Sequence, residues 1–359
     1  MKRNEYIDCV KGIGILCVYL GHLVAYGSPL FRVIFNFHMP LFFFVSGCFF
    51  KPEEERKRYF GRMAVNIGIP ILFFTAIAGV VSIFCPGAEI PHEDTYPYWL
   101  IYLVSTWHSG PVFVSSLWFL LCLAGTQSVA WLICPWCRKS NSRVVVACLT
   151  CIALAGGISR LDLHFKYLFP LHASSIPMAL VFYYGGYLCR KMIMQISQAA
   201  IRSSVASVAV VGLTLEFFFA VVVCKESPNL AVPIFPSLWT FAIASTTGII
   251  SVFLLAKTLS FKPLVFMGRF SLYLYMTETY ARHVAYSVLC VVDSTLPDRL
   301  DVVSLSKWHI GFILILALIC ASCFAWVLSP ALVFIQRRIR DWGAGRRSRV
   351  SFTTQSYSS

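Results

Sequence analysis

The sequence predicts an all-α integral membrane protein of about ten transmembrane helices, with both termini in the cytoplasm. Three observations support this prediction. Hydrophobic residues make up 58% of the 359 residues and charged residues only 13%, whereas a soluble domain carries about 25% charged residues. Apolar runs of membrane-spanning length recur along the chain, and the basic residues between them fall mainly on alternate sides. Because so little charge cannot cover a soluble fold, the apolar surface must face lipid.

The apolar runs give the expected elements in order. A helix needs about 20 mostly apolar residues to cross the hydrocarbon core of a bilayer. Ten runs approach or exceed this length: residues 9–27, 31–50, 64–85, 113–134, 144–159, 173–190, 203–224, 234–256, 264–291 and 309–335. The fifth run is short and the ninth carries several charges. We expect residues 1–335 to form one membrane domain and residues 336–359, which are basic and then rich in Ser and Thr, to form a disordered cytoplasmic tail.

The distribution of Lys and Arg predicts the orientation. If the N-terminus lies in the cytoplasm, 23 of the 30 Lys and Arg residues fall in cytoplasmic segments and 7 in outer segments. This is the positive-inside asymmetry of membrane proteins. The net charge of +14 thus belongs to loops that contact anionic lipid, and it does not indicate a nucleic-acid partner. The expected location is the cell membrane, inner or plasma, and a homo-oligomer remains open.

The cysteines predict no metal site. Most of the 14 cysteines lie inside apolar runs, where they act as small apolar residues. Cys134 and Cys137 form a Cys-Pro-Trp-Cys motif that we take to be isolated. Without a second pair at metal spacing, such a motif is weak support for zinc.

The first run carries ionisable residues on one face. Lys11 and His22 are eleven residues apart, which is three turns plus roughly 20°, so both project from the same side of a helix about 16 Å apart along its axis. Asp8 can pair with Lys11 at i,i+3. Gly12, Gly14 and Gly21 let another backbone approach closely. Ionisable residues inside a span normally face a protein interior or a wet cavity.

The second run carries a histidine at a similar depth. His38 lies roughly 10 Å from the outer end of its helix and His22 roughly 8 Å from the outer end of the first, so the two imidazoles could face one another. Pro40 removes a backbone donor and frees the carbonyl of Asn36. A single membrane histidine often only forms a hydrogen bond between helices. Two histidines, a lysine and an aspartate in adjacent helices favour a functional site.

Several motifs together resemble one family. They are Lys11 and His22 with ten residues between them, Phe37-His38-Met39-Pro40-Leu41-Phe42-Phe43 with Ser46-Gly47, the basic run after the second helix, Trp118-Phe119-Leu120, and Gly268-Arg269-Phe270-Ser271-Leu272-Tyr273-Leu274-Tyr275. The chain is similar over nearly its whole length to the acyltransferase-3 family. The resemblance implies a ten-helix membrane enzyme that moves an acyl group, usually acetyl from acetyl-CoA, to hydroxyls of envelope or exported glycans. Members often have a histidine just after the Ser-Leu-Tyr-x-Tyr stretch, where this chain has Met276-Thr277-Glu278, so Glu278 could take that role.

These motifs suggest roles for individual residues. A sugar hydroxyl needs a base whose pKa lies near ambient pH, and histidine suits this best. We expect His22 to be that base, or else a transient acyl carrier, and His38 to orient the acceptor or share the proton. Lys11 would bind the thioester end of the donor or hold the helix through Asp8.

The donor is expected on the cytoplasmic side. Arg58 and Arg62 are placed to meet the phosphates of coenzyme A, with Arg62 the better candidate because it is nearest the third helix. Trp118 either lines the donor path or only packs. Glu278 and Arg282 are spaced at i,i+4 and could simply neutralise each other.

Two other functional classes remain open at this point. One is a transporter of polysaccharide or lipid-linked sugar without acyl transfer, and the other is a membrane scaffold or sensor with degenerate acyltransferase residues. The intact set of Lys11, His22 and His38 argues against the scaffold.

Overall fold

The chain folds as a bundle of helices, seen here in a computed structural model that describes residues 4–84, 117–161, 170–198, 203–224, 226–259, 261–297, 300 and 302–355. Those residues contain no strand beyond an isolated bridge between Asn229 and Ile234. The helices are α1 (Glu5–Gly21), α2 (Pro29–Cys48), α3 (Arg56–Met63), α4 (Ile69–Phe84), α6 (Leu117–Cys137), α7 (Asn141–Ser159), α9 (Ile176–Gln198), α10 (Ser203–Phe217), α11 (Leu238–Thr258), α12 (Lys262–Arg269), α13 (Ser271–Val292) and α14 (Lys307–Gln355). Two π-helical segments, η1 (Ala64–Gly68) and η3 (Phe218–Val223), join α3 to α4 and extend α10.

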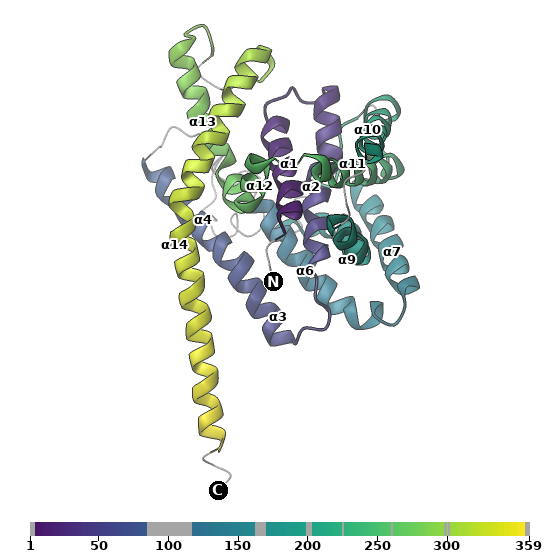
Figure 1. The fold of residues 1–359 in the computed structure, drawn as a ribbon, viewed down its shortest axis with the longest axis vertical. Coiled ribbons are helices and arrows are strands. Elements are labelled where there is room, and N and C mark those ends of the chain that lie inside the picture. Colours follow the sequence, from purple (N-terminus) through teal and green to yellow (C-terminus); the bar gives the residue numbers. More distant parts are fainter. Residues whose placement is uncertain are drawn as a thin grey trace.

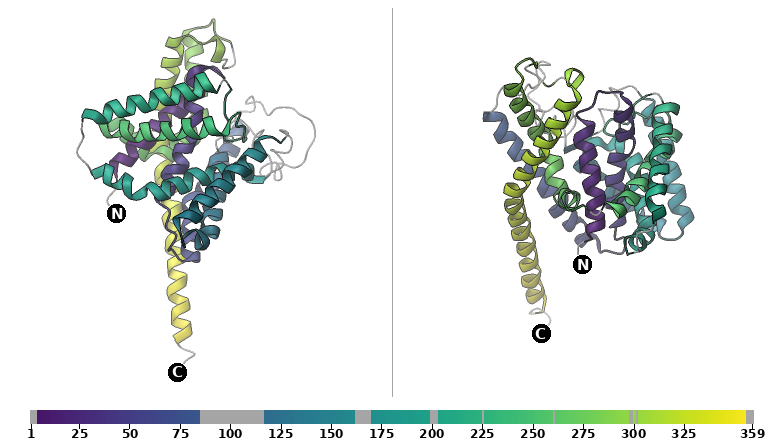
Figure 2. Two further views of the ribbon diagram at one scale, coloured as in Figure 1. Left: turned by 90° about the vertical axis from the view of Figure 1, so that its right-hand side faces the viewer. Right: turned by 45° about the horizontal axis from the view of Figure 1, so that its top comes forward.

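The α1–α2 hairpin lies at the centre of the bundle (Figure 1). Helices α6, α7, α9, α10 and α11 stand on one side of it, and α4, α13 and α14 stand on the other. Figure 2 shows that α14 projects well beyond the other helices at the end that carries the C-terminus. The hairpin therefore contacts helices from both ends of the sequence, which brings distant polar residues to its two ends.

Each of the ten expected runs contains a helix, and the protein is an all-α multi-pass membrane protein. Among the described residues, seven helical segments are long and apolar enough to cross a membrane: Pro29–Cys48, Arg56–Ile77, Leu117–Cys137, Asn141–Ser159, Val205–Val223, Leu238–Thr258 and Lys307–Asp341. The helices α1, α9 and α13 are shorter or more polar than this criterion allows. The number of ten spans and the cytoplasmic termini therefore stay predictions.

The ninth run is not the single helix that we predicted for residues 264–291. It is broken at Phe270 into α12 and α13. The break lets α12 lie against α1 at backbone contact distance. A Cβ added at Gly268 would overlap the backbone carbonyl of Asp8, and one added at Gly12 would overlap the carbonyl of Leu264.

Glycine also brings α2 and α9 together. A Cβ at Gly47 would overlap the carbonyl of Tyr183, and a Cβ at Gly186 would overlap the carbonyl of Phe44. Each helix thus offers a glycine and, three residues earlier, the carbonyl that meets the glycine of the other helix. The contact is therefore reciprocal. Small residues allow such backbone approach in membrane helices, where van der Waals packing drives association.

The expected backbone approach occurs at one of the three glycines of α1. Gly12 meets the backbone of α12, as predicted. Gly14 instead meets the ring of Phe42, and Gly21 meets the side chains of Ile34 and Phe35.

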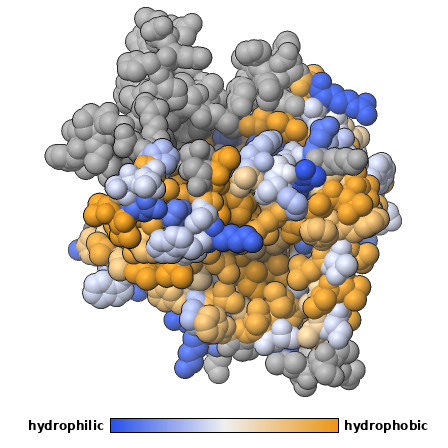
Figure 3. Space-filling model, turned by 90° about the horizontal axis from the view of Figure 1, so that it is seen from above, coloured by the Kyte–Doolittle hydropathy of each residue, from blue (hydrophilic) through white to orange (hydrophobic). Residues whose placement is uncertain are grey.

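Large apolar side chains are exposed on the outside of the bundle. They include Val210 and Val211 on α10, Trp239 on α11, and Trp326 and Val327 on α14, which are 58–77% exposed. Figure 3 shows that hydrophobic residues cover much of the surface seen from above, with hydrophilic residues between them. An apolar exterior of this extent is expected of a protein that lies in lipid.

Helix α14 passes the boundary that we predicted at residue 335. Its backbone stays helical to Gln355, so the start of the expected tail does not coincide with the end of a helix. The division of the chain at this residue remains a prediction.

Candidate active site

The first functional histidine pairs with a buried carboxylate from the other end of the chain. His22 follows the last residue of α1 and caps that helix. Its Nδ1 lies 3.1 Å from Oε1 of Glu278 on α13. The two atoms are close enough for an ion pair, but the angles at the contact are not those of a hydrogen bond. The Glu278 side chain is 1% exposed and the His22 side chain 38%, so the pair joins a buried acid to an accessible imidazole.

Two neighbours hold Glu278 in place. The Arg282 Nε donates to Oε1 of Glu278 at 2.9 Å, and the Thr279 hydroxyl donates to Oε2 at 3.1 Å. The Tyr19 hydroxyl donates to the carbonyl of Leu274 at 2.9 Å, which ties α1 to α13 one turn away. A carboxylate beside Nδ1 orients an imidazole and stabilises its protonated form. The arrangement therefore suits His22 for accepting a proton at Nε2.

His38 is buried near His22 without a direct hydrogen bond to it. The ring of Phe35 is 6.3 Å from the His22 ring and 4.9 Å from the His38 ring, centroid to centroid, so it contacts both. Nδ1 of His38 donates to the carbonyl of Ile34 at 2.7 Å. This bond leaves Nε2 of a neutral His38 free to accept a proton or a hydrogen bond.

The Asn36 carbonyl, which Pro40 leaves without its helical donor, has a partner on another helix. The Ser245 hydroxyl on α11 donates to the carbonyl of Asn36 at 2.5 Å. The Asn36 amide in turn donates to the carbonyl of Arg32 at 2.7 Å. The turn that carries His38 is thus fixed by a neighbouring helix.

Lys11 pairs with Asp8, which confirms the predicted i,i+3 contact. Its Nζ lies 2.8 Å from Oδ1 of Asp8, and the Lys11 side chain is 25% exposed. The same Asp8 presents its backbone to Gly268, so this charge pair lies at the junction of α1 and α12. A contact of Lys11 with a donor thioester stays a prediction.

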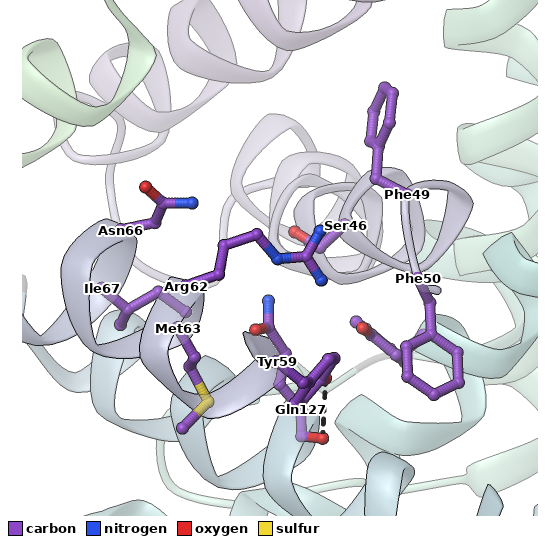
Figure 4. Close-up of a pocket in the computed structure, with 10 residues that line it drawn as sticks. Ser46, Phe49, Phe50, Tyr59, Arg62, Met63, Asn66, Ile67 and Gln127 are labelled. Carbon is purple, nitrogen blue, oxygen red and sulfur yellow. Dashed lines mark hydrogen bonds between the residues drawn. The ribbon is translucent and has the colours of Figure 1, made fainter. Parts of the chain in front are cut away.

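A cavity of about 240 Å³ opens at the end of α2 opposite to His22 (Figure 4). Its lining consists of Ser46, Phe49, Phe50, Tyr59, Arg62, Met63, Asn66, Ile67, Gln127 and Tyr183. The Arg62 guanidinium reaches across the cavity toward Ser46. It also lies 2.5 Å from Glu54 and over the ring of Tyr59, 5.6 Å from the ring centroid. The cavity therefore combines a cation and aromatic rings in one place.

The other two predicted donor-binding residues lie elsewhere. Arg58 is exposed on α3 and does not line this cavity. Trp118 stands at the start of α6, where its ring is 5.8 Å from the ring of His172. The structure thus brings Arg62, but neither Arg58 nor Trp118, to the cavity. Donor roles for Arg58 and Trp118 stay predictions.

One buried acid was missed by the sequence reasoning. Glu216 on α10 is fully buried, and neither carboxyl oxygen has a hydrogen-bond partner among the described residues. Its carboxyl carbon lies close to Gly248 of α11. An acidic residue in the middle of an otherwise apolar run was the signal that could have found it.

The Cys-Pro-Trp-Cys motif is not isolated, contrary to our sequence analysis. Cys148 and Cys151 form a second Cys-x-x-Cys pair on α7, which packs beside α6. All four cysteines are free thiols. In the part of the chain that the structure describes, no group of three or more His, Cys, Asp or Glu residues is placed to hold a metal ion.

A second acid–histidine pair joins α13 to α14 outside the bundle core. Oδ2 of Asp293 lies 3.3 Å from Nε2 of His309. The hydroxyl and amide of Thr295 both donate to Asp293, and these hydrogen bonds lower the pKa of that carboxyl. The Asp293 side chain is 29% exposed, against 1% for Glu278, so this pair offers a comparison for the His22–Glu278 pair.

The chain resembles one protein family over nearly its whole length and two curated proteins over a shorter segment. A family described as "Acyltransferase domain", the acyltransferase-3 family, matches residues 4–329. Two curated relatives share a shorter segment: nodulation protein NolL of Sinorhizobium fredii is 39% identical over 89 residues, and nodulation protein NolL of Mesorhizobium japonicum is 34% identical over 89 residues. Each match covers 21% of this chain and 24% of the relative, so the chain spans about a quarter of the length of these relatives. No solved structure matches the chain. Since the family match extends over nearly the whole sequence and includes both histidine helices, the chain belongs to the acyltransferase-3 family.

Proposed function

We propose that the protein is an O-acyltransferase of the cell membrane that moves acetyl from cytoplasmic acetyl-CoA to a hydroxyl of a cell-envelope or exopolysaccharide sugar. The observation that carries this proposal is the His22–Glu278 pair, in a chain whose family transfers acyl groups. It joins an accessible base to a buried, fixed carboxylate. A proton-coupled transporter can use such a pair as a proton relay, and the family match is what favours acyl transfer here.

The residues of the pair suggest how a hydroxyl is activated. Nε2 of His22 accepts the proton of the sugar hydroxyl as its oxygen attacks the acyl carbonyl. Glu278 stabilises the imidazolium that forms, and Arg282 keeps the carboxylate charged and oriented. The proton then passes to the departing thiolate, so the reaction has no net proton change. His38, beside the same Phe35 ring, is placed to orient the acceptor.

The cavity supplies groups that would bind the phosphate-bearing part of an acyl donor. Arg62 supplies a cation for phosphate oxygens, and Phe49, Phe50 and Tyr59 supply apolar and stacking surface. Bound acetyl-CoA would supply the activated acyl group. Ser46 is eight residues from His38 along α2, which is about 12 Å, so a long flexible thiol arm must lead from the cavity toward the histidines.

The test is incorporation of labelled acetyl from acetyl-CoA into the glycan fraction of membranes that contain the protein. We expect incorporation with the wild type and loss of it with His22→Ala at equal protein level, because the base is gone. His283→Ala, which removes an exposed histidine of α13, is the matched control and should keep the activity. Full incorporation by His22→Ala would contradict the assignment of the base. Movement of sugar across the membrane that survives His22→Ala, without incorporation in any variant, would favour transport.

A further inference from the structure

Helix α14 reaches the cavity from the far end of the chain. The Gln336 Nε2 donates to the carbonyl of Val65 at 2.9 Å, and the Arg340 Nη2 donates to Oδ1 of Asn66 at 2.9 Å. Gln336 and Arg340 are four residues apart and therefore share one face of α14. Their acceptors, Val65 and Asn66, are consecutive residues of η1. The π-helical turn at the cavity is thus held by two hydrogen bonds from residues about 270 positions away.

The bond from Arg340 fixes which end of the Asn66 amide faces the cavity. Because Oδ1 accepts from a guanidinium, the nitrogen must take the other side. Figure 4 shows the Asn66 nitrogen on the side of the Arg62 guanidinium and the oxygen turned away from it. An amide nitrogen carries two donors and no acceptor. The polar end of the cavity thus presents the donors of Asn66 and Arg62.

Ser46 and Gln127 also line the cavity and can accept as well as donate, but the end formed by Asn66 and Arg62 presents donors only, which suits an anion. A sugar hydroxyl both donates and accepts, so a sugar site pairs donors with acceptors. Glu54, the acid nearest to Arg62, is already engaged by that arginine and does not line the cavity. Phosphate oxygens only accept, and they form their strongest bonds with cationic and amide donors.

We propose that Asn66 binds a phosphate group of the acyl donor, and that Arg340 is a positioning residue that holds the Asn66 amide with its nitrogen toward the cavity. This inference rests on the proposed function and adds two residues to it. The exposed guanidinium of Arg340 also adds positive charge beside the cavity mouth. The recognised ligand is a nucleotide-like thioester with several phosphates, and the contact is made by η1 and α14 together.

The decisive variant is Asn66→Asp. A carboxylate at this position keeps the bond to Arg340 and strengthens it. If residue 66 only ties α14 to η1, this substitution would therefore not weaken donor binding. The same carboxylate turns an oxygen instead of a nitrogen toward the cavity, where it repels phosphate. We expect Asn66→Asp to weaken binding of desulfo-CoA, a donor analogue that cannot transfer acyl, on the order of tenfold. The KM for acetyl-CoA should rise in parallel while kcat and the KM for the glycan stay near the wild-type values.

Two substitutions in α14 complete the test. Arg340→Gln should weaken desulfo-CoA binding several-fold, and Arg340→Lys should restore part of it because one donor and the charge remain. Arg338→Gln is the matched control: it removes the same charge from the same helix, but its guanidinium lies over the ring of Phe334, 5.3 Å from the centroid. Its binding should equal that of the wild type.

Binding is measured by calorimetry on the full chain in lipid nanodiscs. The inference is wrong if Asn66→Asp binds desulfo-CoA with wild-type affinity, or if Arg338→Gln and Arg340→Gln lose affinity equally. The proposed function would still hold in that case, provided that acetyl transfer depends on His22. If the wild type binds no desulfo-CoA and transfers no acetyl, the proposed function itself fails, and this inference fails with it.

Discussion

Replacing Glu278 with alanine is expected to reduce acyl transfer by about 10²–10⁴-fold, close to the loss caused by His22→Ala. The carboxylate is the charged group that lies 3.1 Å from Nδ1 of His22. Without it the imidazole loses the group that orients it and stabilises its protonated form. The measurement is the rate of labelled acetyl incorporation per unit of protein, with donor binding checked separately. Because the donor cavity lies at the opposite end of α2, affinity for desulfo-CoA should not change.

Glu278→Gln separates charge from shape. The amide fills the same volume but carries no charge, so we expect a loss of at least about 10²-fold if the charge acts on His22. It also leaves Arg282 without its carboxylate, which alone could disturb the fold. The double variant Glu278→Gln with Arg282→Gln removes that charge, and the loss of activity should persist.

The second acid–histidine pair supplies the control for this series. Asp293→Asn removes the charge that faces His309 at the junction of α13 and α14, and it should leave transfer at the wild-type rate. Wild-type activity in Glu278→Gln would mean that the carboxylate only holds α13 in place. The role assigned to the pair would then be wrong.

Adding one methyl group at Gly186 is expected to destabilise the protein by about 1–3 kcal/mol, the usual cost of overpacking a tight core. The new Cβ would overlap the backbone carbonyl of Phe44, and a backbone cannot move aside as a flexible side chain does. Helices α2 and α9 would have to separate, which would also loosen the reciprocal contact of Gly47 with Tyr183. Gly186→Ala should therefore lower the midpoint of thermal unfolding in detergent.

Gly61→Ala and Gly311→Ala are the matched controls. Both glycines are helical, and a Cβ at either position has no heavy atom within 4 Å. Alanine favours helix over glycine by up to about 1 kcal/mol, so these variants should equal or exceed the wild type in stability. Equal unfolding midpoints for Gly186→Ala and Gly61→Ala would show that α2 and α9 do not approach as closely as described.

The sequence predicts the helices well because each must bury its own backbone hydrogen bonds in lipid. Hydropathy alone places a helix in all ten runs, and helical spacing alone predicts the Asp8–Lys11 pair. The break at Phe270 escapes this reasoning because hydropathy does not indicate where a run bends. The break places α12 against α1, which lies about 260 residues away in the sequence.

Part of the candidate site could also be predicted from local patterns in the sequence. Helical spacing predicts that Lys11 and His22 share one face, and the resemblance drew attention to Glu278. That Glu278 meets His22 depends on how α13 packs against α1, and that Asn66 meets Arg340 depends on how α14 packs against η1. Contacts between residues more than 250 positions apart are set by the whole bundle. No local pattern in the sequence encodes them.

The length of α14 has a mechanical consequence. Its 49 residues extend roughly 74 Å, more than twice the thickness of the hydrocarbon core. Near its start it packs on α13, the helix of Glu278, and farther along it touches η1 beside Asn66. Pro330 lies between His309, which contacts Asp293, and Gln336, which contacts Val65, and a proline inside a helix removes a backbone hydrogen bond and allows a bend at that point. A movement of one end of α14 can therefore reach the other end only through the turn that Pro330 weakens.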